Sequence, residues 1–564
     1  MARKILIGLF VLSSLLAGCA AEPPTAAVTT QPGPQAAHPQ AVTVAPPQPP
    51  QVFLDTTYVP ASGMTITATT ASAFQNALNT AAPGDEVVLM AGTTYTGNFT
   101  LPNKSGSGWI IVRTSAIGQL PASGTRVSPA DAGLMPKIIT PNSEPALLAA
   151  NGAHHFRFVG IEFGMQAGVP INYGIVGFGS DETSLAQLPH HLILDRVYVH
   201  ANPNDELRRA VRLNTGWAAV IDSYLSEAHQ VGFDTQAIGA WSGTGPLKIV
   251  NNTLEAAGEN VLFGGAEVNI PNAILSDIEF RCNLVRKPVA WRTRTPPWSV
   301  KNLFELKQAQ RILIEHNIFE YNWAHAQNGF GILFTPRVET SSLWLVVNDV
   351  MFRNNLLRHS GSAFNISGRD DFDPRFPNQP AQTNRIEITN NLLYDIDGAA
   401  WGGGGIFLQL IGGVRDIKVT HNTVRQANTG NILSMDVLPK DENLIFRDNI
   451  TPHNLYGVYG SGAGIGANGL NAFVNNYEFT NNVIPWAPPD ANPGLYPAGN
   501  FFPVSLSAVG FVNLAVDDYR LAANSPYKGA ASDGADIGAN IDQINAACAT
   551  TALPVKVFLP LIRR

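Results

Sequence analysis

Between residues 195 and 482 the chain repeats one short pattern ten times. The repeated segments are LDRVYVH, IDSYLSE, VNNTLEA, RCNLVRK, EHNIFEY, RNNLLRH, TNNLLYD, THNTVRQ, RDNITPH and TNNVIPW. Their alignment places the following polar markers in one register: Asp195, Asp222, Asn252, Asn283, Asn317, Asn355, Asn391, Asn422, Asn449 and Asn482. The steps between markers run from 27 to 38 residues. A period that recurs this often is typical of a solenoid, whose units pack only against their neighbours.

The segments around the markers predict strands. Short runs such as LKIV, RILI, IEIT and IKVT precede them, and no long amphipathic helical run is found. Short β-runs separated by Gly and Asn turns indicate the coils of a parallel β-helix. Asn tolerates left-handed backbone angles, and its amide can bond the same amide one coil away. We therefore predict an all-β solenoid with the markers stacked in one bend.

Both ends of the repeat region resemble a known superfamily. Residues 71–112 read ASAFQNALNTAAPGDEVVLMAGTTYTGNFTLPNKSGSGWIIV, and residues 518–542 read DYRLAANSPYKGAASDGADIGANID. They resemble the opening and the close of right-handed parallel β-helix proteins of the pectate-lyase-like superfamily. The resemblance implies a right-handed single-stranded solenoid with an N-terminal capping helix over residues 61–542, followed by a tail over 543–564. This scaffold hosts lyases, hydrolases, epimerases and adhesins, so it does not specify the chemistry.

The N-terminus has the pattern of an export signal. Arg3 and Lys4 precede an apolar run over residues 5–16, too short to span a bilayer as a permanent helix. The run ends in LAGC, which resembles the bacterial lipoprotein cleavage box with Cys19 as the lipidated residue. We expect a signal peptide over 1–18, a Pro/Ala/Thr-rich linker over 19–60, and a lipoprotein of the cell envelope, anchored to a membrane outside the cytoplasm. An ordinary secretory signal is the alternative. The other cysteines, Cys282 and Cys548, are far apart in sequence, and no disulfide is expected.

Charge is sparse except in one segment. Charged residues make up 14% of the chain, and the formal net charge is −7, which argues against a nucleic-acid-binding surface. Residues 281–311 nevertheless contain eight Lys and Arg against a single acid, Glu305. A concentrated positive field on an acidic protein attracts an anion such as a uronate, sulfate or phosphate. The alternative is a solvated basic loop.

Aromatic and amide side chains accompany these cations, as in sugar-binding clefts. The residues predicted to bind substrate are Arg292, Arg294, Trp291, Trp323, His325, Gln327, Gln236 and Glu259. They come from consecutive repeats, and repeats stack in a solenoid, so residues about one period apart become neighbours. We therefore expect them on one face of the solenoid.

The stretch LFELKQAQ begins as an alternating strand, in which Glu305 and Lys307 project to the same side. We predict Lys307, Arg337, Glu305 and Asp234 as the catalytic residues. The alternative is that Glu305 and Lys307 form only a surface salt bridge.

The segment from Leu306-Lys307 to Thr335-Pro336-Arg337 is similar to the Lys strand and the following Arg strand of the chondroitinase B and alginate lyase family. This resemblance implies that Lys307 is the base and Arg337 the acid in β-elimination of a uronate-containing polysaccharide. The Glu-x-Glu calcium pair of that family is not matched, because only Glu305 lies nearby. No cofactor is therefore assigned, and calcium is left open.

Two other functions remain open. A glycoside hydrolase of the polygalacturonase type would use two carboxyl groups, which Asp234 with Glu259 or Glu305 could provide. That family's Asp-Asp pair with a nearby Gly-His-Gly is absent from the sequence. The other alternative is a non-catalytic glycan-binding or surface-structural protein. For the lyase, the hydrolase and the glycan-binding protein alike, the expected partners are a polysaccharide and a membrane that the lipid anchor enters. In the lyase interpretation the polysaccharide is anionic. We expect the chain to be a monomer.

Overall fold

The structure is a computed structural model that describes residues 42–337, 342–370, 382–427 and 429–546. The chain divides into two units, Met1–Gln40 and Ala41–Arg564, and the second contains all the sheets. The predicted signal peptide and Cys19 therefore lie outside the described residues, and the boundaries expected there stay a prediction.

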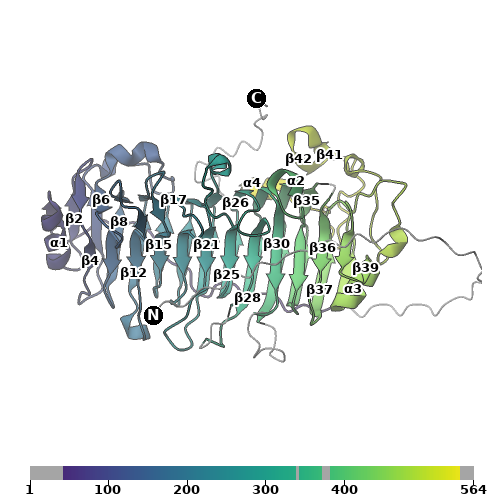
Figure 1. Cartoon of the computed structure of the whole chain (residues 1–564), viewed down its shortest axis with the longest axis horizontal. Helices are drawn as coiled ribbons and strands as arrows, with labels where there is room; N and C mark the ends of the chain where they lie inside the picture. The colour runs from purple at the N-terminus through teal and green to yellow at the C-terminus, as the bar shows by residue number, and fades with distance from the viewer. Residues whose placement is uncertain (1–41, 338–341, 371–381, 428, 547–564) are drawn as a thin grey trace, which may run out of the picture. The chain divides into compact units, whose positions relative to one another are not determined.

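Three long sheets make up this unit (Figure 1). Sheet A contains, in spatial order, β1 (Thr65–Ala68), β2 (Glu86–Leu89), β5 (Ile110–Thr114), β8 (His154–Val159), β12 (His190–Asp195), β16 (Ala218–Ile221), β19 (Leu247–Val250), β22 (Ser276–Arg281), β25 (Ala309–Glu315), β28 (Val347–Arg353), β31 (Thr383–Thr389), β34 (Arg415–Thr420), β37 (Asp441–Arg447) and β40 (Val474–Thr480). Sheet B contains β3 (Thr94–Thr96), β6 (Lys137–Thr140), β9 (Glu162–Met165), β13 (Tyr198–His200), β17 (Tyr224–Ala228), β20 (Thr253–Ala256), β23 (Leu284–Arg286), β26 (Ile318–Asn322), β29 (Leu356–Ser360), β32 (Leu392–Ile396) and β35 (Thr423–Gln426).

Sheet C contains β4 (Phe99–Leu101), β7 (Leu147–Ala149), β11 (Val176–Phe178), β15 (Arg209–Leu213), β18 (Gln236–Ala240), β21 (Glu259–Phe263), β24 (Asn302–Leu306), β27 (Phe330–Phe334), β30 (Ser362–Ser367), β33 (Leu408–Ile411), β36 (Asn431–Met435), β38 (Gly457–Gly460) and β39 (Gly464–Ile465). Two small sheets pair β10 (Ile171–Asn172) with β14 (Glu206–Leu207), and β41 (Phe511–Asn513) with β42 (Asp518–Leu521). The α-helices are α1 (Ala71–Thr80), α2 (Gly398–Trp401), α3 (Ala467–Phe473) and α4 (Ile541–Ala546).

The order of the strands confirms the predicted parallel β-helix. Successive strands along the chain, such as β22, β23 and β24, enter sheets A, B and C in turn, and each pairs in parallel with the strand one coil later. In Figure 1 the colour accordingly changes evenly from coil to coil along the solenoid. Parallel strands give every coil backbone partners in the coils before and after it.

The interior is filled by one continuous apolar core. Side chains at alternate positions of each strand point inward, where those of the same position in adjacent coils stack. Phe446 and Phe479, which pair in register in β37 and β40, illustrate this, because their rings stack with centroids 5.0 Å apart. Both are buried in the same core cluster. Aromatic stacking of this kind stabilises a fold beyond the burial of its area alone.

The predicted N-terminal cap is also confirmed. Helix α1 begins after Thr70, whose side-chain oxygen accepts a hydrogen bond from the backbone N–H of Ala73. Such an N-cap satisfies one of the helix's unpaired N–H groups. On its inner face, Phe74, Ala77 and Leu78 are buried and join the main core. The helix therefore closes the first coil, whose core would otherwise face water.

An asparagine ladder runs through one bend of the solenoid. From Asn252 onward, each marker's amide nitrogen donates to the amide oxygen of the marker in the next coil at 2.9–3.2 Å. Asn317 and Asn355, for example, are joined in this way and both are buried. The predicted stacking is therefore confirmed for these markers. The ladder begins at Ser223, whose N–H donates to Asn252, and extends to Asn500.

Two of the ten predicted markers are not part of this ladder. Asp195 pairs in register with Ile221, two residues before the ladder position, and Asp222 lies one residue before it. The left-handed residue of the bend also differs from the prediction. It is the residue before each ladder Asn, such as His316 (φ 57°) or Asn354 (φ 56°). The ladder Asn is thus selected for its hydrogen bonds, and the left-handed turn comes from its neighbour.

Both ends of the described chain run along the outside of the solenoid. Residues 42–58, from the end of the segment predicted as a linker, follow sheet A. There the N–H of Gln48 donates to Asp349 in β28 at 2.9 Å, and Arg157 in β8 donates to the carbonyl of Thr56 at 2.9 Å. At the other end, β42 and α4 pack on sheet B in a cluster that includes Leu356, Leu392, Tyr394, Tyr519 and Ile541 (Figure 1).

We expect Asn355→Ala to destabilise the solenoid strongly. The change removes the acceptor of Asn317 and the donor to Asn391, and so leaves buried polar groups unpaired. Each such group costs about 1–3 kcal/mol. Thermal unfolding followed by circular dichroism should show a midpoint lower by several degrees. The matched control is Asn475→Ala at an exposed position of β40, which should change little. Equal effects of the two changes would contradict a structural role of the ladder.

Candidate functional site

The predicted catalytic residues lie on the outer face of sheet C. In this sheet Glu305 of β24 pairs in register with Leu262 of β21 and Leu333 of β27. Lys307 follows the strand, and its Nζ lies 3.3 Å from Glu305 Oε1. The two side chains therefore project to the same side, as the alternation predicted.

Lys307 and Arg337 occupy adjacent coils. The backbone N–H of Arg337 donates to the carbonyl of Lys307 at 3.0 Å, so the two residues are direct neighbours in the stack. Their side chains keep 19% and 31% of their surface exposed, so both are reachable from solvent. Arg337 also faces Asp370, at 3.8 Å. The solenoid thus brings together two cations that are 30 residues apart in sequence.

Glu305 is held by two further donors. Besides Lys307, its carboxylate accepts hydrogen bonds from Asn302 Nδ2 at 2.8 Å and from Thr335 Oγ1 at 3.0 Å. Asn302 also donates to the side chain of Gln327 at 3.1 Å. Glu305 itself is 1% exposed. It is therefore a fixed anchor that orients Lys307, and it has no free face to present to a substrate.

Asp234, Glu259 and Gln236 form a second polar group beside it. Lys301 Nζ lies 2.6 Å from Asp234 Oδ1 and 3.2 Å from Glu259 Oε1, and Gln236 donates to Glu259 at 2.8 Å. Burial raises the pKa of Glu259, and the negative charge of Asp234 raises it further. Burial opposes the charge on Lys301, but Glu259 and Asp234 outweigh it and raise the pKa of that ammonium group. Lys301, which was not among the predicted site residues, is thus the centre of this group.

Aromatic and cationic side chains form a wall next to these groups. Arg294 stacks on Trp298 with its guanidinium carbon 3.2 Å from the ring centroid, and Arg292 lies 4.7 Å from the ring of Trp401. Trp323 is only 8% exposed and packs in the cluster that contains Trp298. It supports the wall, and its predicted role in substrate binding stays a prediction. Trp291 is half-buried against the same cluster.

His325 is exposed at the edge of this wall, and Gln327 is half-buried. The Nδ1 atom of His325 accepts a hydrogen bond from the N–H of Val300 at 3.4 Å. The predicted substrate-binding residues therefore belong to sheet C, where Gln236 and Glu259 are the buried first residues of β18 and β21, or to the loops that border it.

The predicted concentration of positive charge is not a single patch. Arg281 and Arg311 lie in sheet A and form ion pairs with Glu315 and Asp277. Arg286 of sheet B forms an ion pair with Glu255. Because one coil passes through all three sheets, 31 consecutive residues are distributed around the whole circumference. Arg292, Arg294, Lys301 and Lys307 remain near the candidate site.

Lys287, another of these cations, is completely buried. Its ammonium group contacts five oxygens, the carbonyls of Ala256, Ala257, Gly258 and Asn302 and the side chain of Asn260, at 2.7–3.1 Å. Burial lowers the pKa of Lys287 well below the usual lysine value. It joins consecutive coils beneath the candidate site and is a structural residue.

Three arginines that the sequence analysis did not select extend the cationic surface. Arg212 pairs in register with Gly239 on the outer face of sheet C, and Arg209 lies with its guanidinium 4.7 Å from the ring centre of Trp241. Arg208 lies 4.3 Å from the ring centre of Phe233. Burial, followed by the charges of Arg212 and Arg208, lowers the pKa of Arg209 to about 10. The run RRAVR just before the coil of Asp234 was the signal that could have revealed them.

The acids of the site do not fit a calcium ion. Ca²⁺ takes six to eight oxygen ligands. Among the described residues, Asp234 and Glu259 contact Lys301, and Glu305 contacts Lys307, Asn302 and Thr335. These carboxylates face ammonium and amide groups, which repel a cation or compete with it. The departure from the Glu-x-Glu pattern therefore agrees with the geometry, and no step is assigned to a metal here.

Among the residues that the structure describes, no helix is long and apolar enough to cross a membrane. Cys282 is disulfide-bonded, so the expectation of no disulfide is wrong.

No model of a known protein family matches the chain, and no curated protein matches its sequence. Among solved structures, the chain is similar to a PL6 family polysaccharide lyase from Pseudopedobacter saltans, with 11% identity, a TM-score of 0.42, and coverage of 78% of this chain and 92% of that one. It is also similar to the PL6 family alginate lyase AlyGC, with 11% identity, a TM-score of 0.43, and coverage of 85% and 58%. A third match is an alginate lyase from Paenibacillus sp. str. FPU-7, with 12% identity, a TM-score of 0.28, and coverage of 78% and 98%. The parallel β-helix itself is established by the strand order of the three sheets.

We expect Lys301→Met to lower the free energy of unfolding by about 3 kcal/mol, because it leaves the buried Glu259 without its cation. The raised pKa of Glu259 means that its carboxyl binds a proton more readily in the folded state. Stability therefore falls as the pH rises through that pKa, and the deficit of Lys301→Met should be smaller at about pH 5 than at about pH 8. Thermal unfolding at both pH values measures this.

The control is Lys528→Met, which removes an exposed pair with Asp536 worth about 0–1 kcal/mol. A second variant, Lys301→Met with Glu259→Gln, should recover part of the loss because the buried charge is gone. A pH-independent deficit in Lys301→Met would show that Glu259 is not the group responsible.

Proposed function

We propose that this chain binds an anionic polysaccharide on the outer face of sheet C and cleaves it by β-elimination. The observation that carries the proposal is the placement of Lys307 and Arg337. They lie on adjacent coils, joined through their backbones, with both side chains open to solvent. The nearby Arg209 and Arg212 on the same sheet supply further cations for a chain of uronates.

β-Elimination makes three demands on a site. The uronate carboxylate must be neutralised, a base must remove the proton at C5, and the oxygen that leaves C4 must be stabilised. Lys307 is the base in this proposal and takes the C5 proton. The C4–O bond then breaks as the C4–C5 double bond forms.

Arg337 stabilises the leaving oxygen, as the lyase resemblance implies. A guanidinium group holds its protons firmly, so we assign Arg337 chiefly a hydrogen-bonding role, with the final proton coming from water. Glu305 has a positioning role. Asn302 and Thr335 fix its carboxylate, and the carboxylate in turn fixes the direction of Lys307.

The hydrolase alternative is less well supported. It needs a carboxylic acid in contact with the glycosidic oxygen and a second carboxylate for water or the sugar. Glu259 has a raised pKa, as such an acid requires, but it is 1% exposed and lies against Lys301 and Gln236. The Asp234 side chain is half-exposed, but Glu259, the second carboxyl group, is buried and therefore out of reach of a polysaccharide.

We expect Lys307→Ala to abolish cleavage without unfolding the chain. A positioned general base contributes about a hundredfold to ten-thousandfold in rate. The thermal midpoint should fall less than in Lys301→Met, because Asn302 and Thr335 still donate hydrogen bonds to the buried Glu305 carboxylate. The assay follows the ultraviolet absorbance of unsaturated uronate products over a panel of polyuronates. Lys418→Ala is the matched control, because Lys418 forms a similar pair with Glu387 at 3.1 Å on sheet A.

Full activity of Lys307→Ala on a cleaved substrate would refute its role as the base. New reducing ends without ultraviolet absorbance would identify a hydrolase. Polysaccharide binding without cleavage by the unaltered chain would identify a glycan-binding protein.

We further propose that the protein is exported and held at a membrane through a lipid on Cys19. The LAGC box after an apolar run supports this, as does the disulfide at Cys282, because disulfides persist mainly in oxidising compartments outside the cytoplasm.

Cys19→Ser should move the protein from the membrane fraction to the soluble fraction, or block its processing. Fractionation followed by immunoblotting measures this, with Cys282→Ser as the control that keeps the predicted lipidation site. An unchanged membrane fraction for Cys19→Ser would exclude anchoring through this residue.

A further inference from the structure

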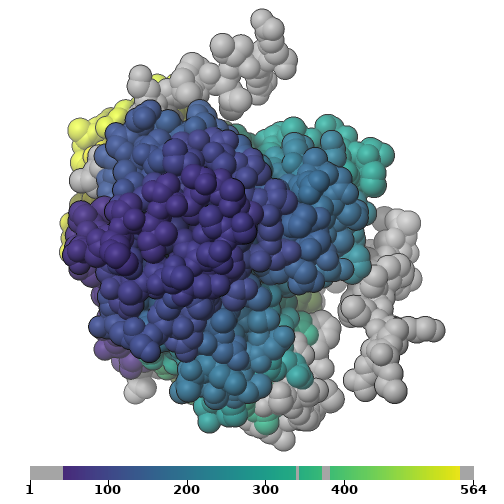
Figure 2. Space-filling view, turned by 90° about the vertical axis from the view of Figure 1, so that its left-hand side faces the viewer, coloured from purple at the N-terminus to yellow at the C-terminus, as the bar shows by residue number. Residues whose placement is uncertain are grey.

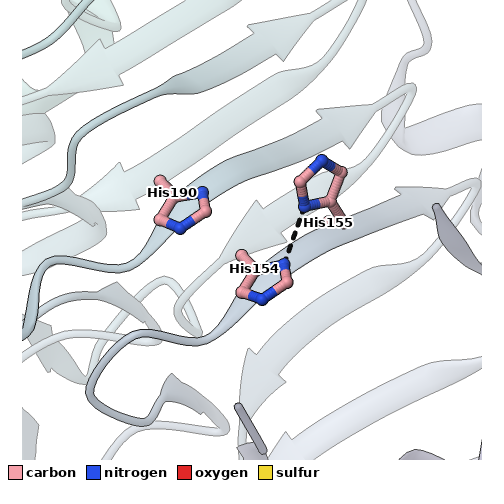
Figure 3. Close-up of side chains that lie close together, drawn as sticks. All are labelled: His154, His155 and His190. Atoms are coloured by element: carbon pink, nitrogen blue, oxygen red, sulfur yellow. Dashed lines mark hydrogen bonds between the residues drawn. The ribbon is translucent and has the colours of Figure 1, made fainter. Parts of the chain in front are cut away.

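Two histidine pairs begin consecutive strands of sheet A, away from the site described above. His154 and His155 open β8, and His190 and His191 open β12. The strands pair with His190 opposite His154. Figure 3 shows the imidazoles of His154, His155 and His190 close together on these neighbouring strands. All four histidines are partly exposed.

The backbone turns both rings of each pair toward one another. Consecutive residues of a regular strand point to opposite faces. His155 and His191, however, have φ values of 59° and 53°, in the left-handed region that side chains other than glycine seldom adopt. As a result, the Nδ1 atoms of His154 and His155 lie 2.7 Å apart, and those of His190 and His191 also lie 2.7 Å apart.

The two pairs stack on each other. The rings of His154 and His190 are parallel to within 3° with centroids 4.8 Å apart, and those of His155 and His191 are parallel to within 9° at 4.4 Å. Ligand nitrogens of His154, His155 and His190 all lie within 4.8 Å of one another. Three imidazoles from two coils thus surround one small volume, and His191 stacks on His155 beside it.

The flanking coils leave this volume accessible. By continuation of the strand register, Gly108-Trp109 precedes the histidines and Gly216-Trp217 follows them. Trp109 lies against His155 at 5.3 Å, and Trp217 stacks on His191 at 4.9 Å. Opposite His154 and His190, the adjacent coils of sheet A place Gly108 and Gly216, which carry no side chain.

A purely structural stack of rings does not account for His154 and His190. Stacking between the two tryptophans would need only His155 and His191, which form one row with them. It gives no reason for His154 and His190 to aim Nδ1 atoms at that row. In each pair one Nδ1 must carry the proton that the other accepts, which is a position that a metal ion can take.

We propose that His154, His155 and His190 bind a divalent transition-metal ion of the zinc class on the outer face of sheet A. Imidazole nitrogens suit Zn²⁺, Cu²⁺ and Ni²⁺. Two such nitrogens at 2.0–2.1 Å from tetrahedral zinc lie about 3.3 Å apart. The 2.7 Å pair of His154 and His155 must therefore open by less than about 1 Å, and His190, now within 4.8 Å, must move closer to it. His191 stacks on His155 and holds its ring in place. The ion would join two consecutive coils.

The electrostatic surroundings agree with this. Burial, together with the neighbouring histidines, lowers the pKa of His155 and of His191 to about 4, and burial lowers that of His190. These imidazoles are therefore neutral near pH 7, with lone pairs available for a metal.

The test is calorimetric titration of the full chain with ZnCl₂ after removal of metals with a chelator, using protein without a histidine tag. We expect saturable binding and a higher thermal midpoint in the presence of zinc. In His155→Asn with His191→Asn the affinity should fall at least tenfold. Asn443 and Asn476 occupy the same left-handed position in later coils, so this variant is compatible with the fold.

His190→Gln, which changes the row formed by His154 and His190, should weaken binding as well. The matched control is His316→Asn at the left-handed position of another bend, where the next coil carries Asn354, and it should bind zinc like the unaltered chain. Circular dichroism confirms that each variant is folded. Absence of saturable binding of Zn²⁺, Ni²⁺ or Cu²⁺ by the unaltered chain would overturn the proposal, and so would equal affinity in the histidine variants and the control.

Discussion

Parallel stacking of each coil on the next is the constraint on which the structure depends. Strands of adjacent coils lie about 4.8 Å apart. Every inward position must therefore accept a neighbour of the same kind one coil away. The asparagine ladder satisfies this at the bend, because an amide is both donor and acceptor and can repeat without limit. Buried amides of this sort cost stability when unpaired, so each one holds the next in register.

The same constraint applies to the outer faces of the sheets. There, side chains at equivalent positions of successive coils form rows, and the contacts along a row determine which groups the surface presents. The left-handed position of sheet A illustrates this. It carries the histidines near the N-terminal end, then alternating charges such as the pair of Asp277 and Arg311, then amides such as Asn443. One backbone conformation thus supports three kinds of side-chain contact. A neighbour one coil away decides whether a residue is stacked, ion-paired or hydrogen-bonded.

The candidate site on sheet C follows from rows in the same way. Lys301 neutralises Asp234 and Glu259 from two other coils, and Lys307 is the backbone neighbour of Arg337. Glu305 lies between the two groups and is fixed by amide and hydroxyl donors. A rigid face with several cations at coil spacing suits a repeating anionic ligand. This repetition of cations along the sheet is the physical reason for an anionic polysaccharide as the proposed substrate.

Much of the fold could be predicted from the sequence, because residues at equivalent positions of successive repeats contact one another in a solenoid. The period, the short β-runs and the Asn markers predict the solenoid, and the alternation in LFELK predicts that Glu305 and Lys307 face one way. Contacts between rows were harder to predict, since the coils differ in length and the register is set by packing. The register removed Asp195 and Asp222 from the ladder, and the passage of one coil through three sheets divided the basic segment. The HH pairs and RRAVR were visible in the sequence, but only stacking decided their neighbours, because side chains one coil apart are distant along the chain and adjacent in space.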